Sequence, residues 1–211
     1  MGFGTGESDA SWGEAIRRLI ATCRSLLAAL EESPQQMPLD PEQCFRLWSS
    51  LGELAFDDWT RWSIEREVIE AKAIAGDFRD SLNRHLSHRR DELLGCLEAG
   101  VEVVLLKVEQ AMGRLEASLR TGEVALALDP DEFEHEIMDR RDRLGRALRL
   151  TEAMGVKVSS AVIGRVEKVD ERLRASLPIA LKKAREIGRP LHQNPDAFPS
   201  FFWWRRIILA D

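Results

Sequence analysis

The sequence is poor in the residues that make turns. Its 211 residues include only 14 glycines and 8 prolines, and it has no tyrosine. A fold of many short strands needs turn residues at short intervals, so this scarcity argues against a β-sandwich or a β-barrel. Hydrophobic residues (44%) and charged residues (31%) occur in the proportions of a globular chain, which excludes a disordered or collagen-like protein. A chain of this length can bury a core without disulfides or metal.

Cysteine and long hydrophobic runs are scarce as well. The three cysteines, Cys23, Cys44 and Cys96, lie far apart and form no Cys-x-x-Cys pair, so we predict neither a disulfide framework nor a zinc site. No apolar run approaches the roughly 20 residues that a membrane-spanning helix needs. The first residues lack the basic and apolar regions of a signal peptide. We therefore expect a cytoplasmic protein without a transmembrane segment, and contact with a membrane surface is disfavoured.

What the chain has in abundance is helical periodicity. No proline occurs in the 88 residues between Glu42 and Asp129. Within this stretch apolar residues recur at alternating steps of four and three, the heptad pattern of coiled-coil packing. This seam consists of Val101, Leu105, Val108, Met112, Leu115 and Leu119. Before the stretch, Asp40 followed by Pro41 predicts a helix start, because Asp caps helices and proline favours the first helical position.

These patterns predict an all-α fold. We expect residues 1–188 to form an antiparallel bundle of four to six long amphipathic helices with coiled-coil-like packing. Residues 189–211 are predicted to form a proline-containing linker and an aromatic C-terminal tail.

Two expectations concern breaks in the helices. Kinks or joints are expected at Gly76-Asp77 and at Gly95 or Gly100, because glycine is the most permissive residue of the backbone. The apolar stripe on either side of Gly155 keeps its phase, which favours one long bent helix over two separate ones.

Charge is unevenly spread along the chain. The net charge is −6, but residues 139–206 hold 16 basic and 8 acidic residues, whereas residues 1–138 hold 14 basic and 27 acidic ones. One predicted helix face is rich in arginine, with Arg140, Arg141, Arg143, Arg146 and Arg149. Such a face can bind an acidic partner or a phosphate backbone, or it can pair with acidic helices of its own domain. Nucleic acid is therefore a possible partner but not the favoured one.

The C-terminal segment is the most unusual part of the sequence. Eight large apolar side chains occur within twelve positions from Phe198 onward. Tryptophan, phenylalanine and arginine are residue types that dominate or populate binding hot spots. The segment could fill a groove on its own bundle, dock into a protein partner or a second copy, or lie at a membrane interface. The residues predicted to bind a partner are Phe198, Phe201, Phe202, Trp203, Trp204, Arg205 and Arg206.

A polar cluster between residues 79 and 92 suggests two chemistries. On a helix, His85, His88, Glu92 and Cys96 fall on one line, and their side chains are of the types that bind zinc. Four arginines crowd the same segment and oppose a cation, so no metal site is predicted. Arg79 and His85, with five residues between them, resemble the arginine-to-histidine motif of HEPN-type ribonucleases. That resemblance implies metal-independent RNA cleavage, with His85 as acid or base and Arg79 holding the phosphate.

No other catalytic motif stands out, and no cofactor is predicted. The leading hypothesis is a non-enzymatic helical scaffold or adaptor subunit of a larger cytoplasmic assembly. It would bind a protein partner, or a second copy of itself, through the C-terminal tail and the arginine-rich helix face. The alternatives are a HEPN-like ribonuclease that uses Arg79 and His85, and a nucleic-acid-binding accessory protein.

Overall fold

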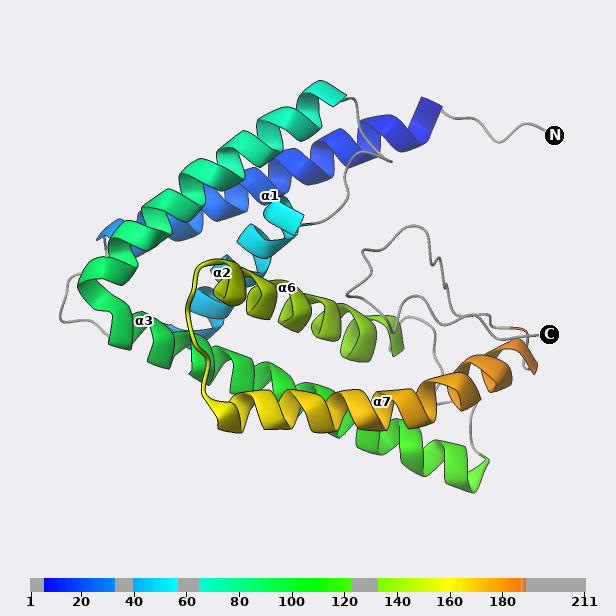
Figure 1. Cartoon of the computed structure of the whole chain (residues 1–211). Helices are drawn as coiled ribbons and strands as arrows, with labels where there is room; N and C mark the ends of the chain where they lie inside the picture. The colour runs from blue at the N-terminus through cyan, green and yellow to red at the C-terminus, as the bar shows by residue number, and fades with distance from the viewer. Residues whose placement is uncertain (1–5, 33–39, 57–64, 123–132, 187, 189–211) are drawn as a thin grey trace. The chain divides into compact units, whose positions relative to one another are not determined.

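The structure is a computed structural model that describes residues 6–32, 40–56, 65–122, 133–186 and 188. Every regular element in these ranges is helical, which confirms the all-α prediction for the described part of the chain (Figure 1). The α-helices are α1 (Gly6–Glu32), α2 (Pro41–Phe56), α3 (Glu65–Thr121), α6 (Arg140–Ala153) and α7 (Ser160–Glu186), and the π-helix η2 (Glu134–Asp139) directly precedes α6. The aromatic tail lies outside the described residues, and the single antiparallel bundle stays a prediction.

The chain divides into two compact units. Unit 1 consists of Met1–Gly100 and Arg146–Lys157, and unit 2 consists of Val101–Gly145 and Val158–Asp211. The long helix α3 therefore supplies its first part to unit 1 and its second part to unit 2, and α6 is divided between the units in the same way.

Local sequence accounts for where α2 begins. The carboxylate Oδ1 of Asp40 accepts a hydrogen bond from the backbone N–H of Glu42 at 3.0 Å, and Pro41 occupies the first helical position. This is the N-cap predicted from the sequence.

The bend in α3 lies at a different residue from those predicted. Arg89 has non-helical backbone angles (φ −132°, ψ 36°), and it is the one such residue within α3, so the expected kinks at Gly76, Gly95 and Gly100 are wrong (Figure 1). The Arg89 side chain holds the carboxylate of Glu92 at 2.7 and 2.5 Å across this bend. Glycine permits a kink without requiring one, and packing can keep it helical.

The prediction of one long bent helix around Gly155 is also wrong, because α6 ends at Ala153 and α7 begins at Ser160. Gly155 has a φ of +65°, and the N–H of Val156 donates to the carbonyl of Thr151 at 2.8 Å. A left-handed glycine with such a hydrogen bond ends a helix. The apolar stripe keeps its phase on either side of Gly155 because its residues in α6 and in α7 are buried. The shared phase does not mean that one helix continues through Gly155.

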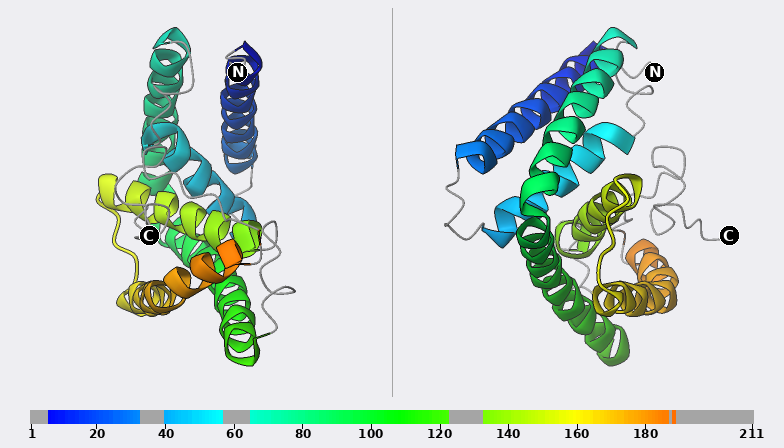
Figure 2. Two further views of the ribbon diagram at one scale, coloured as in Figure 1. Left: turned by 90° about the vertical axis from the view of Figure 1, so that its right-hand side faces the viewer. Right: turned by 60° about the vertical axis from the view of Figure 1, so that its left-hand side comes forward.

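Unit 1 is built from α1, α2, the first part of α3 and the end of α6. The helices α1 and α2 pack on each other, and α1 runs beside the first part of α3 in the same direction (Figures 1 and 2). The largest fully buried side chains of unit 1 are Trp48, Leu51, Leu54, Leu82, Leu93 and Leu97.

Two glycines let the helices of unit 1 come close together. A Cβ atom on Gly100 of α3 would lie 2.3 Å from the carbonyl oxygen of Pro41, at the start of α2. A Cβ atom on Gly52 of α2 would lie 2.4 Å from the carbonyl oxygen of Arg146, on α6. Only glycine fits at these two crossings, so α2 is clamped between backbones on two sides.

Unit 2 is built from the second part of α3, from η2 with the start of α6, and from α7. Successive elements run in opposite directions, so α3 and α7 run in the same direction (Figures 1 and 2). Five residues of the predicted heptad seam are buried to 2% exposure or less: Val101, Leu105, Val108, Met112 and Leu115. On α7 the buried row consists of Val162, Val166, Val169, Leu173 and Leu177.

Candidate functional site

Four of the five arginines predicted to form a basic face contact acidic or aromatic side chains of their own chain. The pairs are Arg140 with Glu136, Arg141 with Asp170, Arg146 with Glu53, and Arg149 with the ring of Phe56. Arg143 is exposed on α6. Most of the positive charge on α6 is therefore balanced within the chain, as expected of side chains that stabilise the helix packing.

The pair of Arg141 with Asp170 is the most deeply buried of these contacts. The guanidinium donates from Nε and Nη2 to the two carboxylate oxygens, at 2.6 and 2.8 Å, and this joins α6 to α7 within unit 2. The two side chains are only 7% and 14% exposed. A two-point contact with this little water demands a fixed orientation of both helices.

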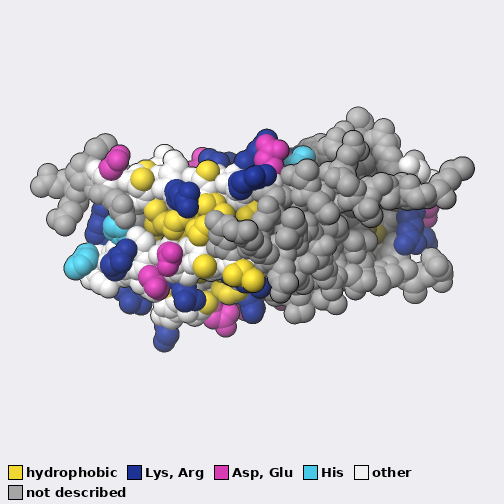
Figure 3. Space-filling model, turned by 90° about the horizontal axis from the view of Figure 1, so that it is seen from above, with side chains coloured by type: hydrophobic (Ala, Val, Ile, Leu, Met, Phe, Trp, Pro, Cys, Tyr) yellow, Lys and Arg dark blue, Asp and Glu magenta, His cyan; other side chains and the backbone are white. Residues whose placement is uncertain are grey.

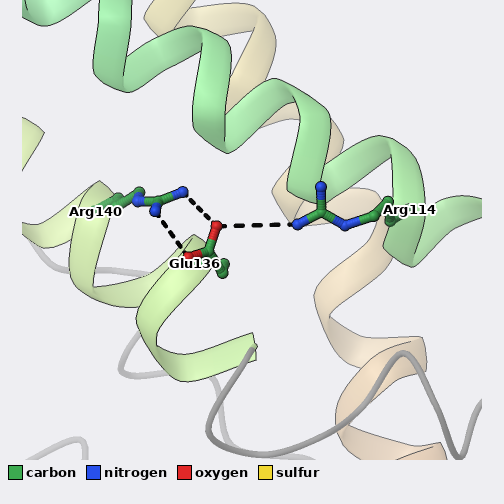
Figure 4. Close-up of polar contacts among 3 residues, drawn as sticks. All are labelled: Arg114, Glu136 and Arg140. Carbon is green, nitrogen blue, oxygen red and sulfur yellow. Dashed lines mark hydrogen bonds and ion pairs between the residues drawn. The ribbon is translucent and has the colours of Figure 1, made fainter.

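Glu136 joins two arginines at the π-helix. Its carboxylate accepts hydrogen bonds from Arg140 at 2.5 and 2.7 Å and lies 3.9 Å from Arg114 of α3 (Figure 4). On the same π-helix, the ring nitrogen Nδ1 of His135 lies 2.8 Å from Asp139 Oδ2. The arrangement ties η2 to α3 by charge, and the Glu136 carboxylate and both guanidinium groups already have partners of opposite charge.

Two ion pairs join α7 to the second part of α3. Arg165 donates to Glu109 at 3.3 and 2.9 Å, and Arg172 donates to Glu116 at 2.9 and 3.0 Å. The hydrogen bonds that the arginines donate to the glutamates raise the pKa of both arginines above the ordinary value. In each pair the arginine lies 56 residues after its glutamate in the sequence. A step of seven residues along α3, from Glu109 to Glu116, therefore accompanies a step of seven along α7, from Arg165 to Arg172. The two helices thus run in the same direction.

The structure does not bring Arg79 and His85 together on one chain. Both lie on α3, where Arg79 is exposed and His85 is half-buried. Six residues of helix turn the second side chain by about 120° and carry it about 9 Å along the axis. The two groups therefore point in different directions, and a joint action on one phosphate stays a prediction.

The second pattern in this segment, the line of His85, His88, Glu92 and Cys96, does not form a metal site either. The carboxylate of Glu92 is bound by Arg89, which lowers its pKa, and the thiol of Cys96 interacts with Cys44 of α2. Among the residues that the structure describes, no group of three or more His, Cys, Asp and Glu side chains could hold a metal ion.

The three cysteines are buried in unit 1. Desolvation, with a smaller contribution from Glu53, raises the pKa of the Cys23 thiol to about 12. Desolvation also raises the pKa of Cys44 and of Cys96. None of the three has the lowered pKa of a cysteine nucleophile.

This burial predicts that the thiols are inert in the native protein. At pH 8 a thiol with a pKa of about 12 holds about a thousandfold less thiolate than one with a pKa of 9.0. We expect Ellman's reagent to modify no cysteine of the folded chain within the time that modifies an exposed thiol, and to modify all three in denaturant. Rapid modification of one native thiol would contradict the buried placement.

Sequence reasoning missed a second row of residues on α3. Val103 (45% exposed), Leu106 (51%), Gln110 and Ala117 are exposed, and Gly113 is half-buried. We call this row the outer stripe. With about 100° per residue, its centre lies on the opposite side of α3 from the buried seam. The signal was present as an alternation of three- and four-residue steps, but the stronger hydrophobic seam on the same helix hid it.

Unit 1 also presents hydrophobic side chains on its surface. Seen from above, they lie in a strip between basic and acidic side chains (Figure 3). On α1 and the first part of α3, Leu19, Leu26, Ile74 and Phe78 are half-buried, and Ile69 is 63% exposed. Partial exposure of apolar side chains is ordinary for a globular protein, so this strip by itself indicates no particular ligand.

The aromatic tail residues predicted to bind a partner all lie outside the described residues. No protein-family model matches the chain, and searches of the curated proteins and of the solved structures find no similar protein. A search of the described helices finds none with the length and apolarity that crossing a membrane requires.

Proposed function

We propose that this protein is a non-enzymatic helical scaffold or adaptor subunit of a larger cytoplasmic assembly, and that it binds its partners through helix faces and the C-terminal tail. The observation that carries this proposal is the two-sided character of α3 in unit 2. One face of the helix is buried in the core, and the opposite face, the outer stripe, is uncharged and exposed at four of its five residues. A helix with two such faces is suited to packing on both sides.

The ion pairs of unit 2 support the scaffold part of the proposal. Arg165 with Glu109 and Arg172 with Glu116 repeat at a spacing of one heptad, in the manner of charged pairs that flank a coiled-coil seam. In this proposal α3 and α7 pack as in a coiled coil, and the helices form an antiparallel bundle. Charged groups that hold helices together in this way are not available for acid–base chemistry.

The arginine-rich face has a smaller role here than in the sequence-based hypothesis. Because Arg140, Arg141 and Arg146 are paired with carboxylates of the same chain, the binding part of α6 is reduced to the surroundings of Arg143. The ribonuclease and nucleic-acid alternatives gain no support from the described geometry.

Deleting residues 198–211 tests the role of the tail. We expect the deletion to reduce the amount of bound partner at least tenfold in a quantitative pull-down, because loss of one buried tryptophan anchor alone costs about 2 kcal/mol or more. The helical circular dichroism signal should stay unchanged. If the shortened chain stays folded and retains every partner, the tail does not bind them.

A further inference from the structure

The outer stripe of α3 has the layout of one side of a coiled coil. Its residues follow one another at steps of three, four, three and four: Val103, Leu106, Gln110, Gly113 and Ala117. In heptad notation these are alternating a and d positions, the positions that face a partner helix. The stripe spans 15 residues, which is about 22 Å of helix.

The charges beside the stripe are sorted by side. The g positions on one edge are Glu102, Glu109 and Glu116, and all are acidic. The e positions on the other edge include Lys107 and Arg114, and both are basic. Glu102 and Lys107 are both exposed, whereas Glu109 and Glu116 already bind arginines of α7 and Arg114 lies 3.9 Å from Glu136. The exposed pair Glu102 and Lys107 therefore carries the comparison of partners.

This sorting distinguishes the possible partners. In a parallel, in-register pair of identical helices, each g residue lies beside the e residue of the following heptad on the other helix, five positions further on. Glu102 would then face Lys107 of the second helix, and Glu109 would face Arg114. In an antiparallel pair, g faces g and e faces e, so glutamates would meet glutamates and cations would meet cations.

We propose that the outer stripe of α3 is a self-association surface, on which α3 of a second copy of this chain packs in parallel and in register. This inference rests on the proposed function and names one occupant of the exposed helix face. Of the parallel and antiparallel arrangements, only the parallel in-register one places the exposed Glu102 of each copy beside the exposed Lys107 of the other, which favours a second copy packed in parallel.

The composition of the stripe sets the strength of the dimer. Val103 and Leu106 supply the large apolar contacts, and Ala117 is small enough to permit close approach. Gly113 is half-buried, and a Cβ atom on it would lie 4.0 Å from Nη2 of Arg172, so a side chain of α7 borders the stripe there. Gln110 is a polar residue at a central a position of the kind that specifies register. An interface of one short helix per copy is small, so dissociation in the range of roughly 10 μM is expected.

Sedimentation velocity of the full chain from about 1 to 500 μM tests the proposal. We expect a reversible monomer–dimer equilibrium.

Leu106→Glu places two carboxylates face to face and should weaken dimerisation more than about 100-fold. Glu102→Lys or Lys107→Glu alone turns two attractive pairs into repulsive ones and should weaken it about 10-fold. The double variant Glu102→Lys/Lys107→Glu restores opposite charges and should return to within about 2-fold of the wild type.

A matched control separates the stripe from the net charge. Glu167→Lys on α7 changes the net charge as Glu102→Lys does, at an exposed position away from the stripe, and should leave dimerisation unchanged. A wild-type chain that is monomeric at every concentration would overturn the proposal, as would a dimer that Leu106→Glu does not weaken or a double variant that is not rescued. Deleting residues 198–211 should leave the equilibrium unchanged; if a dimer forms only after the deletion, the tail and not a second copy occupies the stripe in the intact chain, which also overturns the proposal.

The dimerisation test and the partner-capture test of the proposed function can fail independently. Loss of dimerisation in Leu106→Glu with unchanged partner capture supports self-association through α3 and leaves the tail as the binding element. A monomeric wild-type chain that still captures its partners through the tail refutes the self-association alone.

Discussion

Replacing Asp170 by alanine should lower the free energy of unfolding by about 3–5 kcal/mol. The cause is the burial of Arg141, whose side chain is only 7% exposed and whose Nε and Nη2 atoms donate to the Asp170 carboxylate. Without the carboxylate, the guanidinium would stay in the interior without this two-point contact to an opposite charge, and a desolvated charge is costly. Urea denaturation followed by circular dichroism measures the loss.

Two further variants show whether burial causes this effect. Glu116→Ala breaks the pair with Arg172, in which the side chains are 31% and 36% exposed, and should cost about 1 kcal/mol or less because water screens the pair. The double variant Arg141→Met/Asp170→Leu replaces the buried pair by apolar groups and should be nearly as stable as the wild type. If Asp170→Ala costs no more than Glu116→Ala, the buried ion pair does not hold α6 and α7 together.

Replacing Gly100 by alanine should destabilise the protein by about 2–3 kcal/mol, although alanine is the better helix former. The new Cβ atom would lie 2.3 Å from the carbonyl oxygen of Pro41 and 2.7 Å from the Cβ atom of Phe45. Neither atom is the end of a flexible side chain, so the start of α2 would have to move away from α3. Thermal or urea unfolding measures the change.

Gly95 on the same helix is the matched control. A Cβ atom there meets nothing within 4 Å, so Gly95→Ala should stabilise the protein by about 0.5–1 kcal/mol through its effect on the unfolded chain. A similar change in stability for both variants would show that α2 does not approach α3 at Gly100.

The fold class could be predicted because it depends on local patterns. The proline-free stretch contains the 57-residue helix α3, and the Asp40-Pro41 signal marks the start of α2. The seam residues from Val101 to Leu115 are buried. Each of these follows from the period of a helix and from capping, which act within a few residues. Helix breaks were less predictable, since Gly155 ends a helix, whereas Gly95 and Gly100 continue one.

The contacts of the charged residues could not be predicted, because they depend on tertiary pairing. Nothing local in the sequence indicates that Arg141 meets Asp170, 29 residues away, or that Arg165 meets Glu109, 56 residues away. Arg140 pairs locally with Glu136, but the partners of Arg141, Arg146 and Arg149 lie on other helices, so the stripe looks like a basic face in the sequence. The outer stripe was hidden for a related reason, since periodicity alone does not say which of two faces on one helix is buried.

Cysteine cross-linking at the two ends of the outer stripe tests the central claim most directly. Val103→Cys and Ala117→Cys lie fourteen positions apart, about 21 Å along α3, and both occupy a positions. In a parallel, in-register pair, each residue faces its own counterpart, within the short Cα separation that a disulfide needs. We predict that mild oxidation converts both single variants into disulfide-linked dimers, and that the wild type and Glu167→Cys on α7 stay monomeric on a non-reducing gel. If neither stripe variant cross-links, or if Glu167→Cys cross-links as readily, the outer stripe of α3 does not pair with a second copy.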